Sequence, residues 1–293
     1  MLNRYFAKEE MKDWTSLRKS GYILLPLLIY FLVHDLVEIL LWAGIDGLLT
    51  KGNEQMTAFL TEHAGTLQGV VNGLMILAGV AVIGKTVRTE ICGAAREKKS
   101  FSDAEKNTKP LSKMIPYLIV TVLAFSSALG MNLFLSLLGI AENSEAYAQA
   151  ANAQYGVNFF VGLFLYGIVS PFAEEALFRG VIYQRMKRCL GYLPALFLSA
   201  LLFGCYHGNA VQAVYGTVLG MLIACTYECY GNFAVPVLFH AVANVSIYVL
   251  TCYHSLTEIG RASGMILAAL LLVTAAGCLC YIIHENRTKV RKK

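Results

Sequence analysis

Charged residues are scarce in this chain of 293 residues: Asp, Glu, Lys and Arg make up 15% of it, whereas hydrophobic residues make up 57%. An average soluble protein carries about 25% charged residues. The mean hydropathy is +0.56. A soluble chain of this length would ordinarily form two domains, and so few charges cannot cover two soluble surfaces. The composition therefore excludes an ordinary soluble protein and favours a chain whose solvent is lipid.

Three familiar patterns are absent as well. The first 19 residues are polar and contain no short apolar segment with a small-residue cleavage site, so we expect the first helix to be retained. The eight cysteines include no CxxC pair, and we therefore predict neither a disulfide framework nor a cysteine metal site. Those within apolar segments are expected to be small core residues, namely Cys205, Cys225, Cys229, Cys278 and Cys280. An HExxH zinc motif is also missing.

Long apolar runs are the main feature that is present. A membrane-spanning helix needs ~20 predominantly apolar residues, and runs of that kind recur along the whole chain. They predict an all-α, polytopic membrane bundle of about eight transmembrane helices, because only helices or closed barrels satisfy their backbone groups in lipid. The predicted spans are Ser20–Leu49, Leu67–Val87, Ile115–Ala141, Val157–Arg185, Tyr192–His207, Ala210–Tyr230, Phe233–Tyr253 and Gly260–His284.

The basic residues alternate between connections in a way that predicts topology. Lys and Arg are retained in cytoplasmic loops. Five of the 24 precede the first predicted span, many lie in the connection Arg88–Lys113, and five follow His284, whereas the first connection holds only Lys51. We therefore expect an integral multi-pass membrane protein with both termini in the cytoplasm and an even number of spans. The expected location is a bacterial plasma membrane. The net charge of +5 indicates contact with anionic membrane lipid and no nucleic-acid partner.

The chain divides into two parts that differ in kind. Residues 1–114 hold two predicted spans and the basic segment Arg88–Lys113, which we interpret as a mobile, solvated cytoplasmic loop. Residues 115–293 hold six spans with short links and most of the polar groups that lie inside spans. Function is therefore expected in the second part. In its sixth span, Gly216 and Gly220 predict a close helix contact.

The fourth predicted span carries three charges in six positions: Glu174, Glu175 and Arg179. Each ionisable group inside a membrane costs several kcal/mol unless it is paired or hydrated, so the group needs a reason to be there. Glu175 and Arg179 are four positions apart and share a helix face, which predicts an ion pair, while Glu174 points about 100° away. Pairing one carboxylate leaves the other for chemistry. Arg185 is eleven residues further on, which predicts a depth of roughly 17 Å for Glu174.

Two histidines are predicted at a similar depth. His207 lies thirteen residues after Pro194, roughly 20 Å into the fifth span, and precedes Gly208 at the tip of a hairpin. A polar tip that stops short of the far surface implies a cavity. In the seventh span, His240 and Asn244 share one helix face. The two histidines, the amide and the Glu-Glu-Arg cluster therefore predict one site.

Such a set of side chains has two chemical uses. A carboxylate near a histidine can take a proton from water and make a nucleophile for peptide hydrolysis, while a second histidine and an amide donate hydrogen bonds to the oxyanion. Alternatively, Glu174, His207 and His240 can bind Zn²⁺ with one position open for water. The sequence leaves both open, so the expected cofactor is none or Zn²⁺, and we favour the metal-free reading.

The three motifs resemble those of a known family, the CAAX prenyl proteases and bacteriocin-processing proteases, also called CPBP or abortive-infection proteins. That family carries EExxxR, FxxxH and HxxxN, which here are Glu174-Glu175-Ala-Leu-Phe-Arg179, Phe203-Gly-Cys-Tyr-His207 and His240-Ala-Val-Ala-Asn244. The resemblance covers about Ile115–Tyr253 and implies an intramembrane endopeptidase. It implies that Glu174 and His207 activate the water, that His240 and Asn244 stabilise the oxyanion, and that Arg179 holds the glutamates. The implied partner is a membrane-associated or lipidated peptide.

Two other functions compete with proteolysis. An ion-coupled transporter is suggested by His34, Asp35 and Glu38 in the first span, because intramembrane acids and histidines also form proton relays. Against it, the sequence contains no inverted repeat, and helix pairing or lining of the catalytic cavity also explains these three residues. The second competitor is a non-catalytic immunity or scaffold protein with the same fold. The residues specify neither the substrate, nor the cleavage site, nor the oligomeric state.

Overall fold

The computed structural model describes residues 11, 13–101, 110–140, 143–253 and 260–291. Within these ranges the chain forms α-helices and two π-helical stretches and no strand, which confirms the predicted all-α class. The helices that precede the fourth predicted span are α2 (Ser16–Lys51), α3 (Glu54–Glu62), α4 (Ala64–Phe101), α5 (Pro110–Leu137) and α6 (Glu145–Tyr155). They are followed by α7 (Phe159–Phe164), η1 (Leu165–Val169), α8 (Ser170–Glu175), η2 (Ala176–Ile182), α9 (Tyr183–Leu190), α10 (Tyr192–Tyr206), α11 (Ala210–Tyr230), α12 (Ala234–Cys252) and α13 (Arg261–Arg291).

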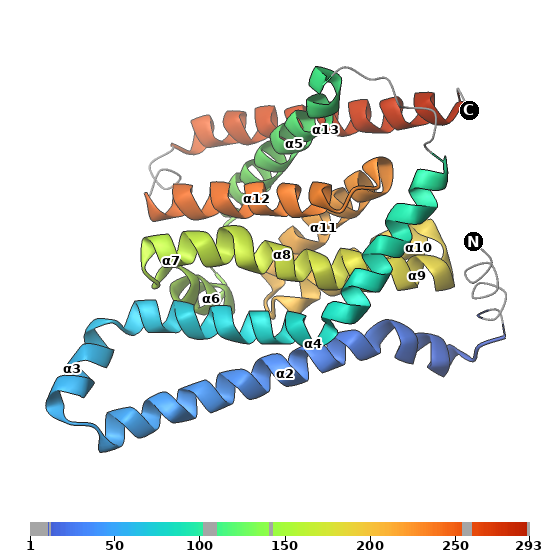
Figure 1. The fold of residues 1–293 in the computed structure, drawn as a ribbon. Coiled ribbons are helices and arrows are strands. Elements are labelled where there is room, and N and C mark those ends of the chain that lie inside the picture. Colours follow the sequence, from blue (N-terminus) through green and yellow to red (C-terminus); the bar gives the residue numbers. More distant parts are fainter. Residues whose placement is uncertain (1–10, 12, 102–109, 141–142, 254–259, 292–293) are drawn as a thin grey trace. The chain divides into compact units, whose positions relative to one another are not determined.

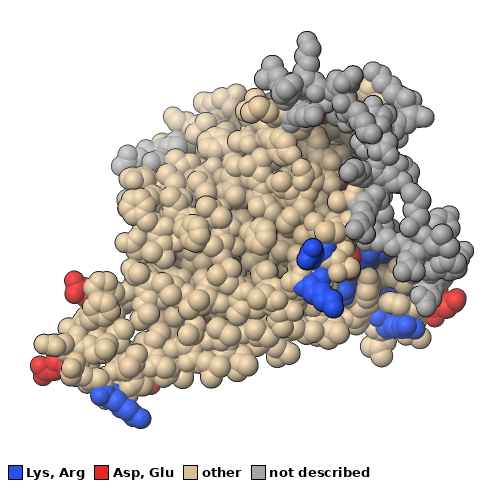
Figure 2. Space-filling view, in the orientation of Figure 1, with Lys and Arg blue, Asp and Glu red and all other residues tan. Residues whose placement is uncertain are grey.

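Seven of the helical segments in the described ranges are long and apolar enough to cross a membrane. They correspond to seven of the eight predicted spans, so the polytopic bundle is confirmed. The exception is α10, which has 15 residues and is therefore only about 22 Å long, shorter than the ~30 Å hydrocarbon layer. On the face that Figure 2 shows, most side chains are uncharged, and only a few small groups of charged residues are seen.

The prediction of a solvated loop at Arg88–Lys113 was partly wrong. The helix α4 continues to Phe101, and α5 begins at Pro110, so only 102–109 lie outside both helices, and these lie outside the described residues. The basic side chains of 88–101 give this part of α4 a low hydropathy, which hid its helical state, because Lys, Arg and Glu are good helix formers when water surrounds them. The cytoplasmic location of the two termini stays a prediction.

The chain forms two compact units, which we describe separately. Unit 1 comprises residues 1–90 and 153–195, and unit 2 comprises residues 91–152 and 196–293. The division of the sequence after residue 114 was based on where the polar residues lie within the spans, not on how the helices pack. It stays a prediction.

Unit 1 is built on α2, α4 and the continuous helical path from α7 to α9. The ring of Tyr30 in α2 packs on Gly79 of α4: a Cβ atom added there would lie 2.7 Å from the ring. On another side of α4, Ile76 packs with Leu165 and Ala173 of the helical path. The two long helices α2 and α4, joined by α3, run alongside each other in Figure 1. This unit places α8 and η2 against neighbouring helices.

Unit 2 has an apolar core around α5. This helix packs against both α12 and α13, and α11 also contacts these three helices; Figure 1 shows α5 crossing between α12 and α13. The core includes Leu123 of α5, Ile223 of α11, Phe239 of α12 and Ile282 of α13, all at most 1% exposed. The end of α5 continues this packing through Leu133 against Ala268 of α13. The core fixes α12, which carries His240.

The prediction that these cysteines are core residues holds only in part. Cys229 and Cys278 are half-buried and pack against the core of unit 2, Cys225 is half-buried, and Cys205 and Cys280 are exposed. In a soluble protein an apolar run is buried, but in a membrane its outward face meets lipid and stays apolar. Hydropathy alone therefore could not tell which face of each helix these cysteines occupy.

Candidate active site

The Glu-Glu-Arg motif lies on a helical path with two π-helical stretches. The short helix α8, which carries both glutamates, stands between η1 and η2. Pro171 lies at the start of α8. Because proline has no N–H and its ring collides with the carbonyl four residues earlier, it disturbs the regular α-helical pattern at Gly167, inside η1. Single π-helical turns within α-helices are rare and frequently mark functional sites.

Arg179 and Glu175 form the ion pair that their spacing predicted. Nη1 of Arg179 donates to Oε1 of Glu175 over 2.8 Å, and both side chains are 0% exposed. The surrounding segment is buried on every side: all residues from Ala173 to Tyr183 are buried. A buried charge that loses its partner is strongly destabilising. The two charges therefore stabilise each other inside the buried segment.

Glu174 has a different partner. The Ser170 hydroxyl donates to Oε1 of Glu174 over 2.5 Å, and both residues are 8% exposed. The two glutamates are thus held from opposite directions along the helix: Glu174 by a neutral donor one turn earlier, and Glu175 by a guanidinium one turn later. Ser170 was not singled out from the sequence, although its i−4 spacing from Glu174 was a usable signal.

His207 lies at the tip of the α10–α11 hairpin, as predicted. The two helices approach closely at Gly204, where an added Cβ would lie 2.3 Å from both the Ala213 carbonyl oxygen and Thr217 Oγ1. Gly216 is the matching residue on α11, since a Cβ there would lie 3.1 Å from Gly204 Cα. This confirms the predicted close helix contact at Gly216. The close packing of α10 on α11 therefore fixes the position of the hairpin tip that carries His207.

The turn after His207 is fixed by two residues. Gly208 has a φ of +74°, a conformation that glycine adopts without strain. Asn209 then caps α11, because its Oδ1 accepts from the Gln212 N–H over 2.9 Å. Its Nδ2 donates to the His207 carbonyl over 3.3 Å. The backbone of His207 is therefore held from the C-terminal side.

The imidazole of His207 has a defined tautomer. Its Nδ1 lies 3.0 Å from the Phe203 carbonyl oxygen. A carbonyl oxygen only accepts, so Nδ1 must carry the proton, and in the neutral ring Nε2 is then the acceptor. An imidazole oriented in this way can take a proton at Nε2 or bind a metal there.

Phe203 brings the two histidines of unit 2 together. Its ring meets the His207 ring edge-on at a centroid distance of 5.1 Å and the His240 ring at 5.5 Å, both with an interplanar angle of 89°. Phe203 is 3% exposed and His240 is 5% exposed. The phenylalanine of the FxxxH pattern therefore has a physical role: it fills the space between α10 and α12 and orients both imidazoles. Asn244 is half-buried one turn after His240 on α12.

The structure thus groups the predicted site residues in two sets. Glu174, Glu175 and Arg179 come together in unit 1, and His207 and His240 come together in unit 2, with Asn244 one turn away. A site that both sets share stays a prediction from the sequence.

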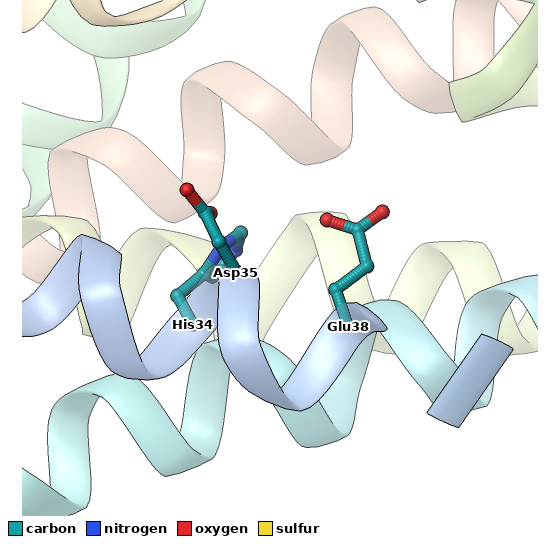
Figure 3. Close-up of side chains that lie close together, drawn as sticks. All are labelled: His34, Asp35 and Glu38. Atoms are coloured by element: carbon teal, nitrogen blue, oxygen red, sulfur yellow. The ribbon is translucent and has the colours of Figure 1, made fainter. Parts of the chain in front are cut away.

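The three polar residues of the first span lie at mid-helix in α2 (Figure 3). His34 Nδ1 lies 2.8 Å from Asp35 Oδ1, and the His34 ring stacks on Tyr30 at a centroid distance of 5.7 Å. One ligand atom from each of His34, Asp35 and Glu38 lies within 4.8 Å of the others, which is close enough for a metal ion. The Asp35 side chain is 63% exposed, and surface acids often lie close together without an ion. The role of this cluster stays open.

Two comparisons with known proteins support a membrane protease at the family level. Residues 156–246 match the family described as Type II CAAX prenyl endopeptidase Rce1-like. The chain is also 22% identical over 188 residues to a Bacillus subtilis (strain 168) protein named "Putative membrane peptidase YdiL", an alignment that covers 64% of this chain and 72% of that protein. No solved structure matches.

The matched segment begins just before α7 and ends within α12. It contains all three motifs, whereas α2 to α6 and α13 lie outside it. Together with the seven apolar helices, the match supports an integral, multi-pass membrane protein. The resemblance to the CAAX prenyl protease family that the three motifs predicted is therefore confirmed, and residues 156–246 carry it.

Proposed function

We propose that this protein is an intramembrane endopeptidase that hydrolyses a peptide bond in a membrane-associated or lipidated peptide. The observation that carries the proposal is the burial of two adjacent glutamates and an arginine inside an apolar helical segment. Arg179 pairs with Glu175, and the Ser170 hydroxyl donates to Glu174. We assign Glu175 to structure and Glu174 to proton transfer, as the motif resemblance implies. The family match adds support for peptide hydrolysis.

In the proposed reaction, Nε2 of His207 accepts a hydrogen bond from a water molecule and orients it. The Glu174 carboxylate takes one proton from this water, whose oxygen attacks the peptide carbonyl carbon. His240 and Asn244 donate hydrogen bonds to the oxyanion that forms on the carbonyl oxygen. The C–N bond then breaks, and the proton held by the general base passes to the departing amine. Arg179 pairs with Glu175 and keeps the motif in place.

The same donors also fit a metal. A histidine whose Nδ1 donates to a backbone carbonyl presents Nε2 as zinc ligands commonly do, and His207 has this arrangement. Bound by Glu174, His207 and His240, Zn²⁺ would supply a Lewis acid that activates the water. We favour the metal-free mechanism, and the experiment below separates the two.

The test is cleavage of a peptide library, including prenylated C-terminal tails and leader peptides, by the purified protein in lipid nanodiscs. We expect cleavage by the wild type and a loss of about 10²–10⁴-fold in kcat for Glu174→Gln and for His207→Ala. Glu62→Gln, which changes an exposed glutamate of α3, is the matched control. Cleavage that a chelator abolishes, with one zinc per chain, would overturn the metal-free mechanism. An unchanged rate in Glu174→Gln would overturn the assignment of the general base.

The proximity of His34, Asp35 and Glu38 keeps transport as a second candidate function. It predicts ion or solute flux in proteoliposomes that Asp35→Asn abolishes and Glu174→Gln leaves intact. Flux of that kind in a protein that cleaves no peptide would replace the protease proposal. Preserved biological effect in Glu174→Gln without cleavage or flux would favour the scaffold function.

A further inference from the structure

Helix α4 lies along the whole helical path that carries the glutamates. An added Cβ at Gly65 would lie 2.7 Å from the Gly156 carbonyl oxygen, and one at Gly69 would lie 2.5 Å from Val161 Cγ1. Further on, Ile76 packs with Leu165 and Ala173. The helix α4 and the path run in the same direction, because later residues of one contact later residues of the other. The family match at 156–246 does not include α4.

Two polar contacts from α4 flank the catalytic motif. On one side, Asn72 Nδ2 donates to the Tyr166 hydroxyl over 3.1 Å, at η1. On the other side, Oε1 of Glu90 accepts a hydrogen bond from Nε of Arg185 over 2.9 Å. Glu90 also pairs with Arg188, and both arginines lie in α9. Glu90 is 5% exposed. The motif therefore lies between two points that α4 fixes.

Arg185, which pairs with Glu90, also contacts α2. Its Nη1 donates to the Tyr22 carbonyl oxygen over 2.5 Å, and its guanidinium lies 4.2 Å from the centroid of the Tyr22 ring. Charge-assisted bonds of this kind are roughly twice as strong as neutral ones, and a guanidinium over an aromatic face adds further attraction. The C-terminal end of the path is thus the more firmly held of the two.

Both π-helical stretches lie at or between the polar contacts of α4. Asn72 contacts Tyr166 within η1, and Glu90 contacts Arg185 and Arg188 just after η2. A π-helical turn bonds i to i+5 and so holds more residues than an α-helical turn. If η1 or η2 relaxed to α-helix, the residues between the contacts would rotate about the helix axis.

We propose that α4 is a positioning element of the protease, and that Glu90 is its main positioning residue. By holding α9 at the end of η2, Glu90 keeps η2 in its π-helical form and thereby sets the direction in which Glu174 points. Asn72 does the same at η1 with a weaker, neutral contact. The consequence for catalysis rests on the proposed function, whereas the consequence for η2 does not.

The test uses the full chain in nanodiscs and two readouts. Glu90→Gln keeps the size of the side chain but removes its charge. We expect backbone hydrogen exchange of 176–190 to rise roughly tenfold relative to wild type, since this segment opens locally. We expect kcat to fall by about tenfold or more with KM within about twofold, because small displacements of a reacting group reduce rate more than binding. Glu62→Gln is the control for both readouts.

Two further variants keep the outcome decisive. Glu90→Asp retains the charge and should recover part of the exchange protection and of kcat. Glu90→Gln combined with Arg185→Gln should cost no more than the larger single effect, because the two residues act through one contact. Exchange and kcat both at wild-type values in Glu90→Gln would overturn the proposal. If the wild type cleaves no peptide, the proposed function fails, and exchange in 176–190 alone still decides the role of α4.

Discussion

The two compact units hold their polar groups in different ways. In unit 1 the helical path of the glutamates is held by charge: Arg179 pairs with Glu175, and Glu90 pairs with Arg185 and Arg188. In unit 2 the histidines are held by neutral contacts, namely the edges of Phe203 and a backbone carbonyl, beside an apolar core of α5, α11, α12 and α13. Ion pairs therefore position the glutamates in unit 1, whereas contacts with an aromatic ring and a backbone carbonyl position the histidines in unit 2.

The difference teaches how each set of residues responds to change. A buried ion pair has a large cost of separation, because one charge without its partner remains in a medium of low dielectric constant. Neutral edge contacts between rings contribute only about 0.5–1.5 kcal/mol each beyond the area they bury. Single substitutions in unit 1 should therefore have the larger effects, and those in unit 2 should act locally.

The largest expected effect is the loss of one partner of the central ion pair. Arg179→Met should destabilise the fold by about 3–5 kcal/mol, because it leaves Glu175 buried beside an apolar side chain. The double variant Arg179→Met with Glu175→Leu should recover most of that stability, since it removes both charges together. Thermal unfolding in one fixed detergent measures both. A double variant as unstable as the single one would show that the pair is not the source of the effect.

The sequence predicted this ion pair correctly because it is local. Glu175 and Arg179 are separated by one helical turn, and helix geometry alone places them on one face. Seven of the eight spans were equally predictable, since their hydropathy is high and each needs ~20 residues. The hairpin tip at His207 followed from Gly208 and Asn209, which are both turn residues.

The rest could not be predicted from the sequence, because it depends on contacts between distant segments. The contact of Glu90 with Arg185 joins residues 95 positions apart, and no local rule connects them. The stretch η2 contains no proline and no other recognised signal, so its π-helical form was not foreseen. The double role of Phe203 depends on the packing of α12 against α10, which hydropathy does not encode.

A middle-sized effect is expected from the loss of the Ser170 hydroxyl in unit 1, compared with the loss of a buried hydroxyl in unit 2. Ser170→Ala removes the donor to the Glu174 carboxylate and should lower stability by about 1.5–3 kcal/mol and kcat by about tenfold, because bonds to charged groups are worth more than neutral ones. Ser127→Ala in α5 is the matched control. Its hydroxyl, also buried, donates to the Leu123 carbonyl over 2.6 Å, an oxygen that α-helix geometry already places within reach of a backbone N–H.

We therefore expect Ser127→Ala to change stability by less than about 1 kcal/mol and to leave kcat intact. Unfolding in detergent and peptide cleavage are measured for both variants side by side. Equal losses of stability and of kcat in the two variants would mean that the effect of Ser170→Ala does not come from its hydrogen bond to Glu174.

The smallest effect is expected from the neutral contacts of unit 2. Phe203→Leu removes both aromatic edges at once and should cost about 1–3 kcal/mol, the sum of two such contacts. The bond from His207 Nδ1 to the backbone carbonyl of residue 203 does not involve the replaced side chain. The tautomer should therefore survive while both rings become more mobile, so kcat should fall about tenfold without a shift in the nitrogen-15 resonances that report the Nδ1–H tautomer. Phe239→Leu, in the apolar core of the same unit, should cost similar stability but keep kcat. A tautomer that changes in Phe203→Leu would show that the side chain, and not the helix backbone, orients His207, and the contrast between charged and neutral control of the two sets would then be wrong.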